Sequence, residues 1–148
     1  MLAAGLRVRT TVRAEARAGV ARDLIRRGGA WAPESVEFRV ADLLSDQGWA
    51  EACAGCRYVL HAASPMGAAE GAAALERAAV EGTLRVLRTA RDAGVSRVVY
   101  TSTCGAVYYG HPLRAEPFDE TSWTDLDSAD MSAYVRSKAL AERAAWDF

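Results

Sequence analysis

The sequence predicts an α/β fold, a doubly wound parallel sheet with helices on both of its faces. Four short segments rich in β-branched residues alternate along the chain with stretches of helical periodicity. Strands that alternate with helices form βαβ units, whose crossover connections make the strands parallel and cover both faces of the sheet. The chain has 148 residues, of which 51% are hydrophobic and 25% charged, so its length and composition are those of one soluble globular domain.

The first half of the chain contains two of the predicted strands. Residues 6–12 are rich in β-branched side chains and alternate in polarity, which indicates a strand, and residues 14–27 have the pattern of a helix. The glycines at 28–29 end that helix, because glycine readily takes the left-handed conformation common at helix ends. A second strand at 36–41 and a short helix at about 46–54 follow.

The second half opens with a third strand and a long helix. The strand at 58–63 is stopped by Ser64 and Pro65, and an alanine-rich helix then runs to about Ala93, where Gly94 ends it. The apolar face of this helix is predicted to consist of Leu75, Ala79, Gly82, Val86 and Ala90.

A fourth strand at 97–102 enters the small-residue turn 103–106, and a loop leads to a last helix at about 129–146. In open parallel sheets, ligands bind beyond the carboxyl ends of the strands. This rule selects a set of candidate site residues that directly follow the strands: Arg13, Asp42, Ala62, Ala63, Ser64, Ser102 and Thr103.

Composition and charge exclude several classes of partner. The net charge is −1, the isoelectric point is about 6.1, and the arginines are scattered along the chain. We therefore expect no nucleic-acid partner. We also expect no membrane partner and a cytoplasmic location, because no apolar run approaches the roughly 20 residues of a membrane span and the first residues lack the layout of a signal peptide.

The cysteine and histidine residues do not have the spacing of a metal site. Cys53 and Cys56 form a C-x-x-C pair, but no second pair of Cys or His follows at a spacing that would complete the four ligands of zinc. We predict a structural role for both cysteines and no metal. His61 is expected to be a strand residue and His111 a loop residue, neither of them a ligand.

The two ends of the sequence lack parts that a dinucleotide-binding unit normally has. Such a unit opens with a strand, a glycine-rich turn and a helix, but this chain begins with residues 1–5, which resemble the last turn of a helix. It also stops after a helix, where a further strand would be expected. We therefore interpret residues 1–148 as a partial domain from a larger protein. The absent first strand would lie between the strands at 6–12 and 58–63.

Lys138 is the only lysine among the 18 lysine and arginine residues, and it follows Tyr134 by four positions. Lysine offers a compact ammonium, whereas arginine offers a planar fork, so the two are not interchangeable. Positions four apart share one face of a helix, so we expect the phenol and the ammonium to lie side by side. A nearby cation favours an ionised phenol, and the pair can therefore carry out proton chemistry.

With these segments in order, the chain resembles the extended short-chain dehydrogenase/reductase (NAD-dependent epimerase/dehydratase) family, and most closely its dihydroflavonol-4-reductase-like branch. The similarity covers essentially all 148 residues. The matching stretches are 8–13, 41–43, 59–65, 80–83, 97–103, 119–123 and 134–142 followed by Ala145 and Trp146. The resemblance implies a Rossmann-like NAD(P)-binding domain.

The resemblance also implies a catalytic set. Tyr134 would be the general acid that protonates the substrate carbonyl oxygen, and Lys138 would support it and bind the nicotinamide ribose. Thr103 aligns with the family's catalytic serine or threonine, whose hydroxyl steadies the substrate oxygen. Ser102 is the alternative for that role, and a turn-capping function remains open for both hydroxyls.

The implied cofactor is NADP, with NAD possible. An acidic residue after the second strand of the family binds the ribose of NAD, whereas an arginine such as Arg13 meets the 2′-phosphate of NADP. Arg17 either adds a second contact or is a solvated surface charge. The residues expected to bind the cofactor are Arg13, Asp42, Leu43, Ala62, Ala63, Ser64, Ser102, Tyr134 and Lys138.

The expected function is the reduction of an aldehyde or ketone by hydride transfer. A nucleotide-sugar epimerase or dehydratase of the same superfamily is one alternative, and a non-catalytic remnant that acts as a binding or dimerising module is another. The plant dihydroflavonol reductases carry an asparagine where this chain has Tyr108, which argues against a flavonoid substrate. The family often dimerises through the long helix and the catalytic helix, so a homodimer is expected. Thr83 is expected to be a packing residue.

Overall fold

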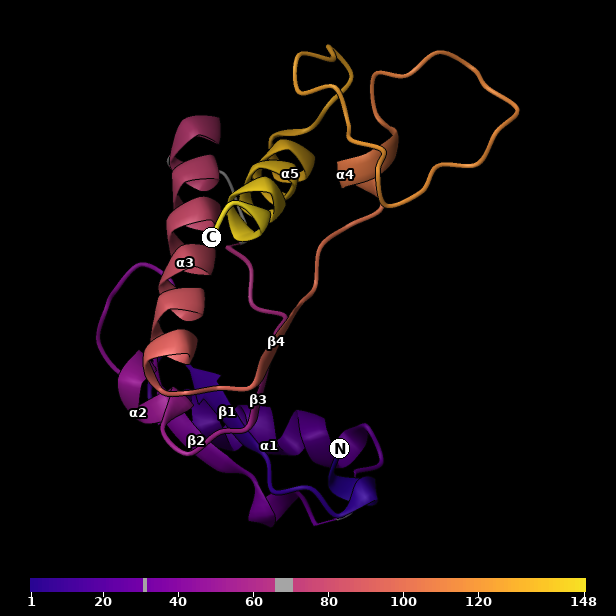
Figure 1. Cartoon of the computed structure of the whole chain (residues 1–148). Coiled ribbons are helices and arrows are strands. Elements are labelled where there is room, and N and C mark those ends of the chain that lie inside the picture. Colours follow the sequence, from indigo (N-terminus) through magenta and orange to yellow (C-terminus); the bar gives the residue numbers. More distant parts are fainter. Residues whose placement is uncertain (31, 66–70) are drawn as a thin grey trace.

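The computed structural model describes residues 1–30, 32–65 and 71–148. Helices and strands alternate in the described chain as the sequence predicts (Figure 1). Their bounds, in chain order, are η1 Leu2–Ala4, β1 Arg9–Val12, α1 Arg17–Arg27, η2 Pro33–Ser35, β2 Glu37–Val40, α2 Trp49–Cys53, β3 Tyr58–His61, α3 Ala72–Asp92, β4 Arg97–Tyr100, α4 Gly105–Tyr108 and α5 Ala133–Trp146.

The four strands form two separate two-stranded parallel sheets. β1 pairs with β2 with Arg9 opposite Glu37, and β3 pairs with β4 with Tyr58 opposite Arg97. In the described part of the chain, β1 and β3 are not hydrogen-bonded to each other. The predicted parallel pairing is therefore confirmed, and the sheet is incomplete at the position where the sequence analysis placed a missing strand.

Each strand is shorter than predicted and ends before the candidate site residues. The third strand ends at His61 and not at Ala63, and the fourth ends at Tyr100 and not at Ser102. The residues that follow have left the ladder, although Thr101 still donates its backbone N–H to the carbonyl of His61 at 3.0 Å. The candidate side chains therefore lie on loops that the strand ends hold in place.

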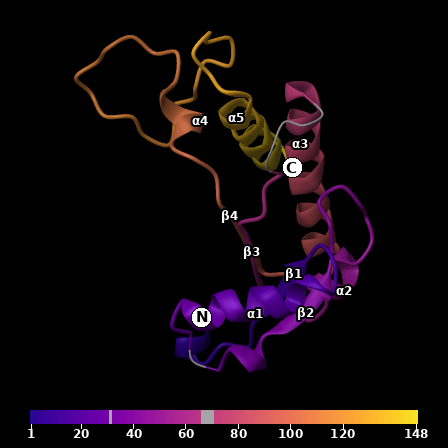
Figure 2. The same cartoon turned by 180° about the vertical axis from the view of Figure 1, so that it is seen from behind.

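Helices α3 and α5 pack side by side in one half of the molecule, while α1 lies in the other half, with the strands between them (Figures 1 and 2). The predicted apolar face of α3 is confirmed, since all five of its residues are buried, together with Thr83. The buried residues of α5 are Ser137, Lys138, Ala139 and Ala141. Small side chains on both helices allow this close packing. Gly82 of α3 lies against the loop after β2, where a Cβ would meet Leu43 Cβ at 3.0 Å.

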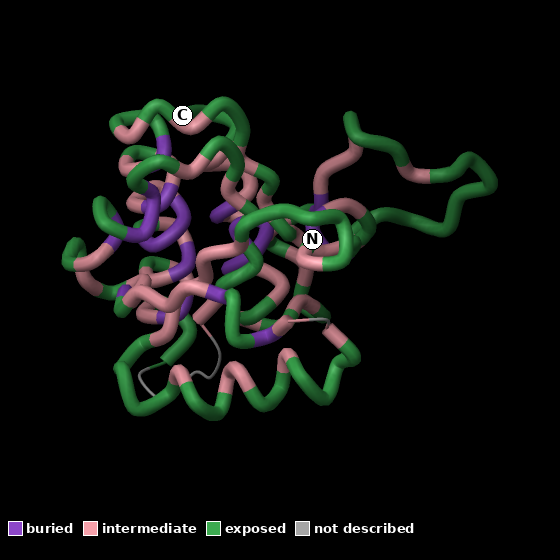
Figure 3. Tube along the Cα trace, turned by 90° about the horizontal axis from the view of Figure 1, so that it is seen from below, coloured by how far each residue is buried: buried purple, intermediate pink, exposed green. Residues whose placement is uncertain are grey.

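A small core joins the ends of the strands to the helices. Ala41, Trp49 and Val86 form a buried cluster, against which Leu43 and Val59 pack. The indole nitrogen of Trp49 donates to the carbonyl of Asp42 at 2.9 Å, which satisfies the polar atom of this buried ring. Figure 3 shows the buried residues gathered among the helices and strands, with an exposed loop that projects from them.

That projecting loop connects α4 to α5 and contains two differences from the prediction. Residues 105–108, predicted to lie in a turn and a loop, form the short helix α4, and α5 begins at Ala133, four residues later than expected. The cap explains this later start, because the hydroxyl of Ser132 accepts the backbone N–H of Val135 at 3.3 Å. Buried Thr124 anchors the loop by donating to the carbonyl of Gly105 at 2.8 Å.

In the described residues, no helix combines the length and the apolar composition that crossing a bilayer requires.

Substitution of Gly48 by alanine should destabilise the fold by about 3 kcal/mol, because two costs combine there. Gly48 has a φ of +82°, and a Cβ would lie 1.9 Å from the carbonyl oxygen of Val40. Gly55, at the other end of α2, has a φ of +68°, but no atom lies within 4 Å of the position that a Cβ would take there. Gly55→Ala is therefore the matched control, with an expected loss of about 1 kcal/mol. Chemical denaturation would measure both losses, and equal values would contradict the prediction.

Candidate functional site

A cavity of about 580 Å³ lies at the carboxyl ends of β1, β2 and β3. It brings together five of the residues that the sequence selected: Arg13, Asp42, Leu43, Ala63 and Ser64. They come from three different loops, and the cavity unites them because parallel strands end at the same edge. Ala62, which was selected with them, does not line this cavity.

Two side chains at this cavity differ in how they are bonded. The carboxylate of Asp42 accepts the backbone N–H of Leu44 at 2.9 Å, which fixes the turn after β2. The hydroxyl of Ser64 is buried and has no hydrogen-bond partner in the described structure. A buried polar atom without a partner is costly, so this hydroxyl suits a polar ligand in the cavity.

Helix α3 supplies a wall of the cavity that the sequence analysis did not select. Arg77 and Glu81, one turn apart on α3, both line it. Both residues lie on the face of α3 opposite Ala79 and Val86. The sequence shows this charged face, but a charged helix face usually contacts only solvent, so it did not indicate a binding site.

The second group of candidate residues lies where α5 meets the end of β4. The ammonium of Lys138 donates to the carbonyl oxygen of Thr101 at 2.6 Å and lies 4.4 Å from the centre of the Tyr100 ring. Lys138 is only 3% exposed. The carbonyl and the ring face are the partners that a buried cation needs.

His61, the last residue of β3, lies close to this lysine and to the Tyr100 ring. Its ring centre is 5.3 Å from that of Tyr100, and the residue is 3% exposed. Burial, followed by the positive charge of Lys138, lowers the pKa of His61 from 6.5 to about 4. His61 is therefore neutral at neutral pH. Its position in a strand and that of His111 in a loop were both predicted.

The two hydroxyls of the turn after β4 have different partners. Ser102 donates its hydroxyl to the carboxylate of Glu142 on α5. Thr103 accepts the backbone N–H of Gly105 at 3.3 Å. Ser102 is thus engaged with α5, while Thr103 shapes the start of α4.

Tyr134 and Lys138 share α5 but differ in exposure. Tyr134 is 40% exposed, whereas Lys138 is buried. No hydrogen bond joins the phenol to the ammonium within the described structure, in which the ammonium donates to the carbonyl of Thr101. The two residues therefore lie one turn apart on α5, as expected, but their side chains are not hydrogen-bonded to each other in the described structure.

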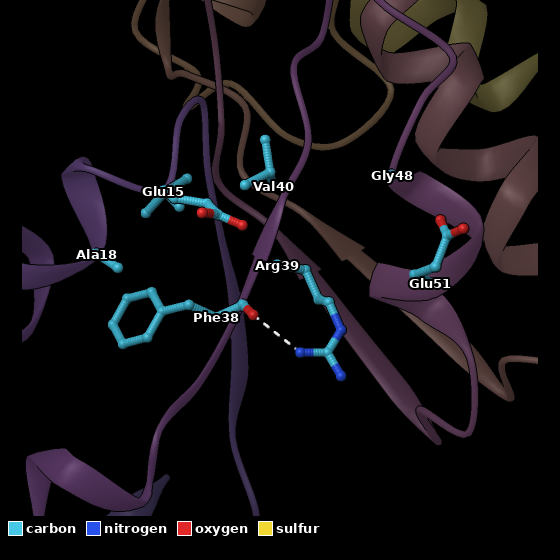
Figure 4. A pocket seen from close by; sticks show the side chains of 8 residues that line it. Glu15, Ala18, Phe38, Arg39, Val40, Gly48 and Glu51 are labelled. Atoms are coloured by element: carbon cyan, nitrogen blue, oxygen red, sulfur yellow. Dashed lines mark hydrogen bonds between the residues drawn. The ribbon is translucent and has the colours of Figure 1, made fainter.

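A second cavity, of about 350 Å³, lies between α1, β2 and α2 (Figure 4). Phe38 and Arg39 line it, and the Arg39 guanidinium donates to the carbonyl of Phe38 at 3.0 Å. None of the predicted site residues belongs to its lining.

Among the described residues, no cluster of three or more His, Cys, Asp or Glu side chains could hold a metal ion. Cys53 is buried, and burial raises the pKa of its thiol, an effect that Cys56 reinforces. The Cys56 thiol donates to the carbonyl of Ala52 at 3.4 Å. These contacts are those of packed thiols.

The titration of His61 should make stability depend on pH. In the unfolded chain His61 takes its ordinary pKa of 6.5, against about 4 when folded, so the unfolded state binds more protons between these values. Stability should therefore fall by about 3 kcal/mol as the pH drops from 6.5 to 4. Denaturation at several pH values should show this slope in the wild type and in His111→Asn, and a weaker slope in His61→Asn. An unchanged slope in His61→Asn would contradict the prediction.

Comparison with known proteins points to one protein family. The sequence profile of the NAD dependent epimerase/dehydratase family matches residues 2–148. A dihydroflavonol 4-reductase of Hordeum vulgare is 36% identical over 156 aligned positions, which cover 100% of this chain and 43% of that protein.

Solved structures give the same result. Vestitone reductase from alfalfa (Medicago sativa) superimposes with a TM-score of 0.76 at 31% identity, over 99% of this chain and 46% of that one. Gre2 from Candida albicans, solved in complex with NADPH, superimposes with a TM-score of 0.73 at 26% identity, over 99% and 46% of the two chains. This chain thus spans less than half the length of these three relatives. The profile, the relatives and the Rossmann-like α/β fold together establish that the chain belongs to the NAD dependent epimerase/dehydratase family.

Proposed function

We propose that this chain carries the catalytic residues of an NADP-dependent oxidoreductase that reduces an aldehyde or ketone by hydride transfer. The observation that carries the proposal is the cavity at the strand ends, which is lined by Arg13, Asp42 and Ser64. These are an arginine, a carboxylate and a hydroxyl without a hydrogen-bond partner among the described residues, at the edge where α/β sheets bind ligands.

The residues of the cavity fit a dinucleotide. Arg13 follows β1, where its guanidinium would bind the 2′-phosphate of NADP through paired hydrogen bonds. Asp42 and Leu43 would border the adenine, while Ala62, Ala63 and Ser64 would line the path of the cofactor. The NADPH complex of Gre2 supports this choice. When bound, NADPH supplies the hydride.

The end of β4 and helix α5 would carry the proton chemistry. Tyr134 would donate a proton to the carbonyl oxygen of the substrate as that oxygen gains negative charge. Lys138 would contribute a fixed positive charge close to that proton donor, and Thr103 a hydroxyl that steadies the oxygen. Ser102 is the alternative hydroxyl. The supporting observation is that Lys138 is held at the end of β4, the strand that leads into Ser102 and Thr103.

A reductase fits the residues better than an epimerase or dehydratase of the family. A tightly held NAD favours an acidic residue where this chain has Arg13. Tyr108 stands where the plant dihydroflavonol reductases have asparagine, so we do not propose a flavonoid as the substrate. A homodimer formed through α3 and α5 and a cytoplasmic location stay predictions.

Replacing Arg13 by glutamate should weaken NADPH binding about 10- to 100-fold, because a charged hydrogen bond to phosphate is lost and a like charge is introduced. NADH binding should stay within about twofold, because NADH lacks that phosphate. Fluorescence titration of the full-length protein with both cofactors would measure the dissociation constants. Arg27→Glu, in the last turn of α1, is the control for a general change of charge. An equal loss for both cofactors would contradict the assignment of Arg13.

Replacing Tyr134 by phenylalanine should lower kcat at least about 100-fold, because the proton donor is removed. The dissociation constant for NADPH should change little. The measurement is the oxidation of NADPH by the full-length protein with a panel of aldehydes and ketones. Tyr58→Phe, on an exposed tyrosine of β3, is the matched control. An unchanged kcat in Tyr134→Phe would refute the proposed role.

A further inference from the structure

Two hydrogen bonds tie one face of α5 to consecutive residues at the end of β4. The Lys138 ammonium donates to the carbonyl of Thr101 at 2.6 Å, and the Glu142 carboxylate accepts the hydroxyl of Ser102. Lys138 and Glu142 are four positions apart, so they lie on the same face of the helix, one turn from each other. The helix is therefore held to the strand end at two points.

The second of these bonds limits what Ser102 can do. A serine hydroxyl has a single proton to donate, and here it goes to the carboxylate of Glu142. While that bond is intact, Ser102 cannot also donate to a substrate oxygen. Thr103 differs, because its hydroxyl oxygen accepts from Gly105, which leaves the threonine proton available for another acceptor.

We propose that the Ser102–Glu142 hydrogen bond is a clamp that positions α5 on the β4 end, so that Glu142 is a positioning residue for Lys138 and Thr103 supplies the substrate-facing hydroxyl. This inference rests on the proposed reductase function for its catalytic consequence. The clamp itself is a property of the folded chain.

The geometry around Lys138 explains why such a clamp is needed. The ammonium is buried, with one carbonyl and one ring face as its neighbours. A small shift of α5 along the strand end would move it away from the carbonyl of Thr101. A bond one turn further along the helix prevents that shift, because a charged acceptor makes a stronger hydrogen bond than a neutral one.

The single lysine allows a direct test that does not depend on turnover. Because Lys138 is the only lysine in the chain, acylation of its amine by a small reagent can be followed at one site by mass spectrometry of the peptide. We expect Ser102→Ala and Glu142→Ala each to increase the acylation rate about tenfold, the effect of losing one charged hydrogen bond. The double variant should be no faster than either single variant, because both remove the same bond.

Three further variants separate a clamp from general destabilisation. Glu142→Gln retains a neutral acceptor for the Ser102 hydroxyl and should give an acylation rate between that of the wild type and that of Glu142→Ala. Asp147→Asn removes a carboxylate at the end of the same helix and should leave the rate unchanged. Val86→Ala weakens the core on α3 without touching the clamp. At equal loss of stability, Lys138 should be acylated more slowly in Val86→Ala than in Glu142→Ala. Wild-type rates in the clamp variants, or an equal rate in Val86→Ala, would overturn the proposal.

The catalytic consequence is tested with NADPH and carbonyl substrates in the full-length protein. Thr103→Val should lower kcat about 100-fold, whereas Ser102→Ala and Glu142→Ala should lower it about tenfold, with KM for NADPH little changed and with partial recovery in Glu142→Gln. If Ser102→Ala costs as much as Thr103→Val while Lys138 acylates at the wild-type rate, Ser102 is the substrate hydroxyl and the proposal fails. Absence of turnover in the wild type would refute the proposed function, while the acylation rates would still decide the clamp.

Discussion

The buried ammonium of Lys138 constrains the arrangement of the candidate site more than any other group. Its hydrogen bond to the carbonyl of Thr101, 2.6 Å long, fixes where α5 crosses the end of β4. A buried charge is tolerated only with such partners, so the strand end, the Tyr100 ring and the helix must all keep their places. An arginine could not replace it, because a planar fork with five donors would leave several unpaired in the same space. The composition of the chain, which uses arginine elsewhere, agrees with this requirement.

The candidate site consists of two parts that α3 connects. One part is the cavity at the ends of β1, β2 and β3, which carries the residues suited to a dinucleotide. The other is the junction of β4 and α5, which carries Lys138 and the hydroxyls. Helix α3 lines the cavity with its first turns and packs along α5 with its buried face. The β3–β4 ladder joins one side of the cavity to this junction, but the β1–β2 sheet is not hydrogen-bonded to it in the described chain. Packing on α3 therefore links the β1–β2 side of the cavity to the junction.

Sequence reasoning selected several residues of the cavity because the strands themselves are easy to recognise, although their last residues are not. Short β-branched runs indicated the strands, and the rule that ligands bind at their carboxyl ends selected Arg13, Asp42, Ala63 and Ser64, which the fold does bring to one cavity. Tertiary packing decided which side chains line the cavity. Ala62 does not line the cavity, and Arg77 does, because the path of a loop and the rotation of a helix depend on tertiary packing. The short helix α4 was missed for the same reason, since buried Thr124 from a distant loop stabilises it.

The sequence by itself determined the α/β class, the parallel pairing, the apolar face of α3 and the set of residues at the strand ends. Each of these follows from local periodicity and from the geometry of βαβ units. Only the tertiary structure decided which partner each polar group takes. It directed Lys138 to Thr101 and not to the phenol of Tyr134, and it engaged Ser102 with Glu142. Those choices depend on contacts between residues about 40 positions apart, and sequence spacing carries no information about them.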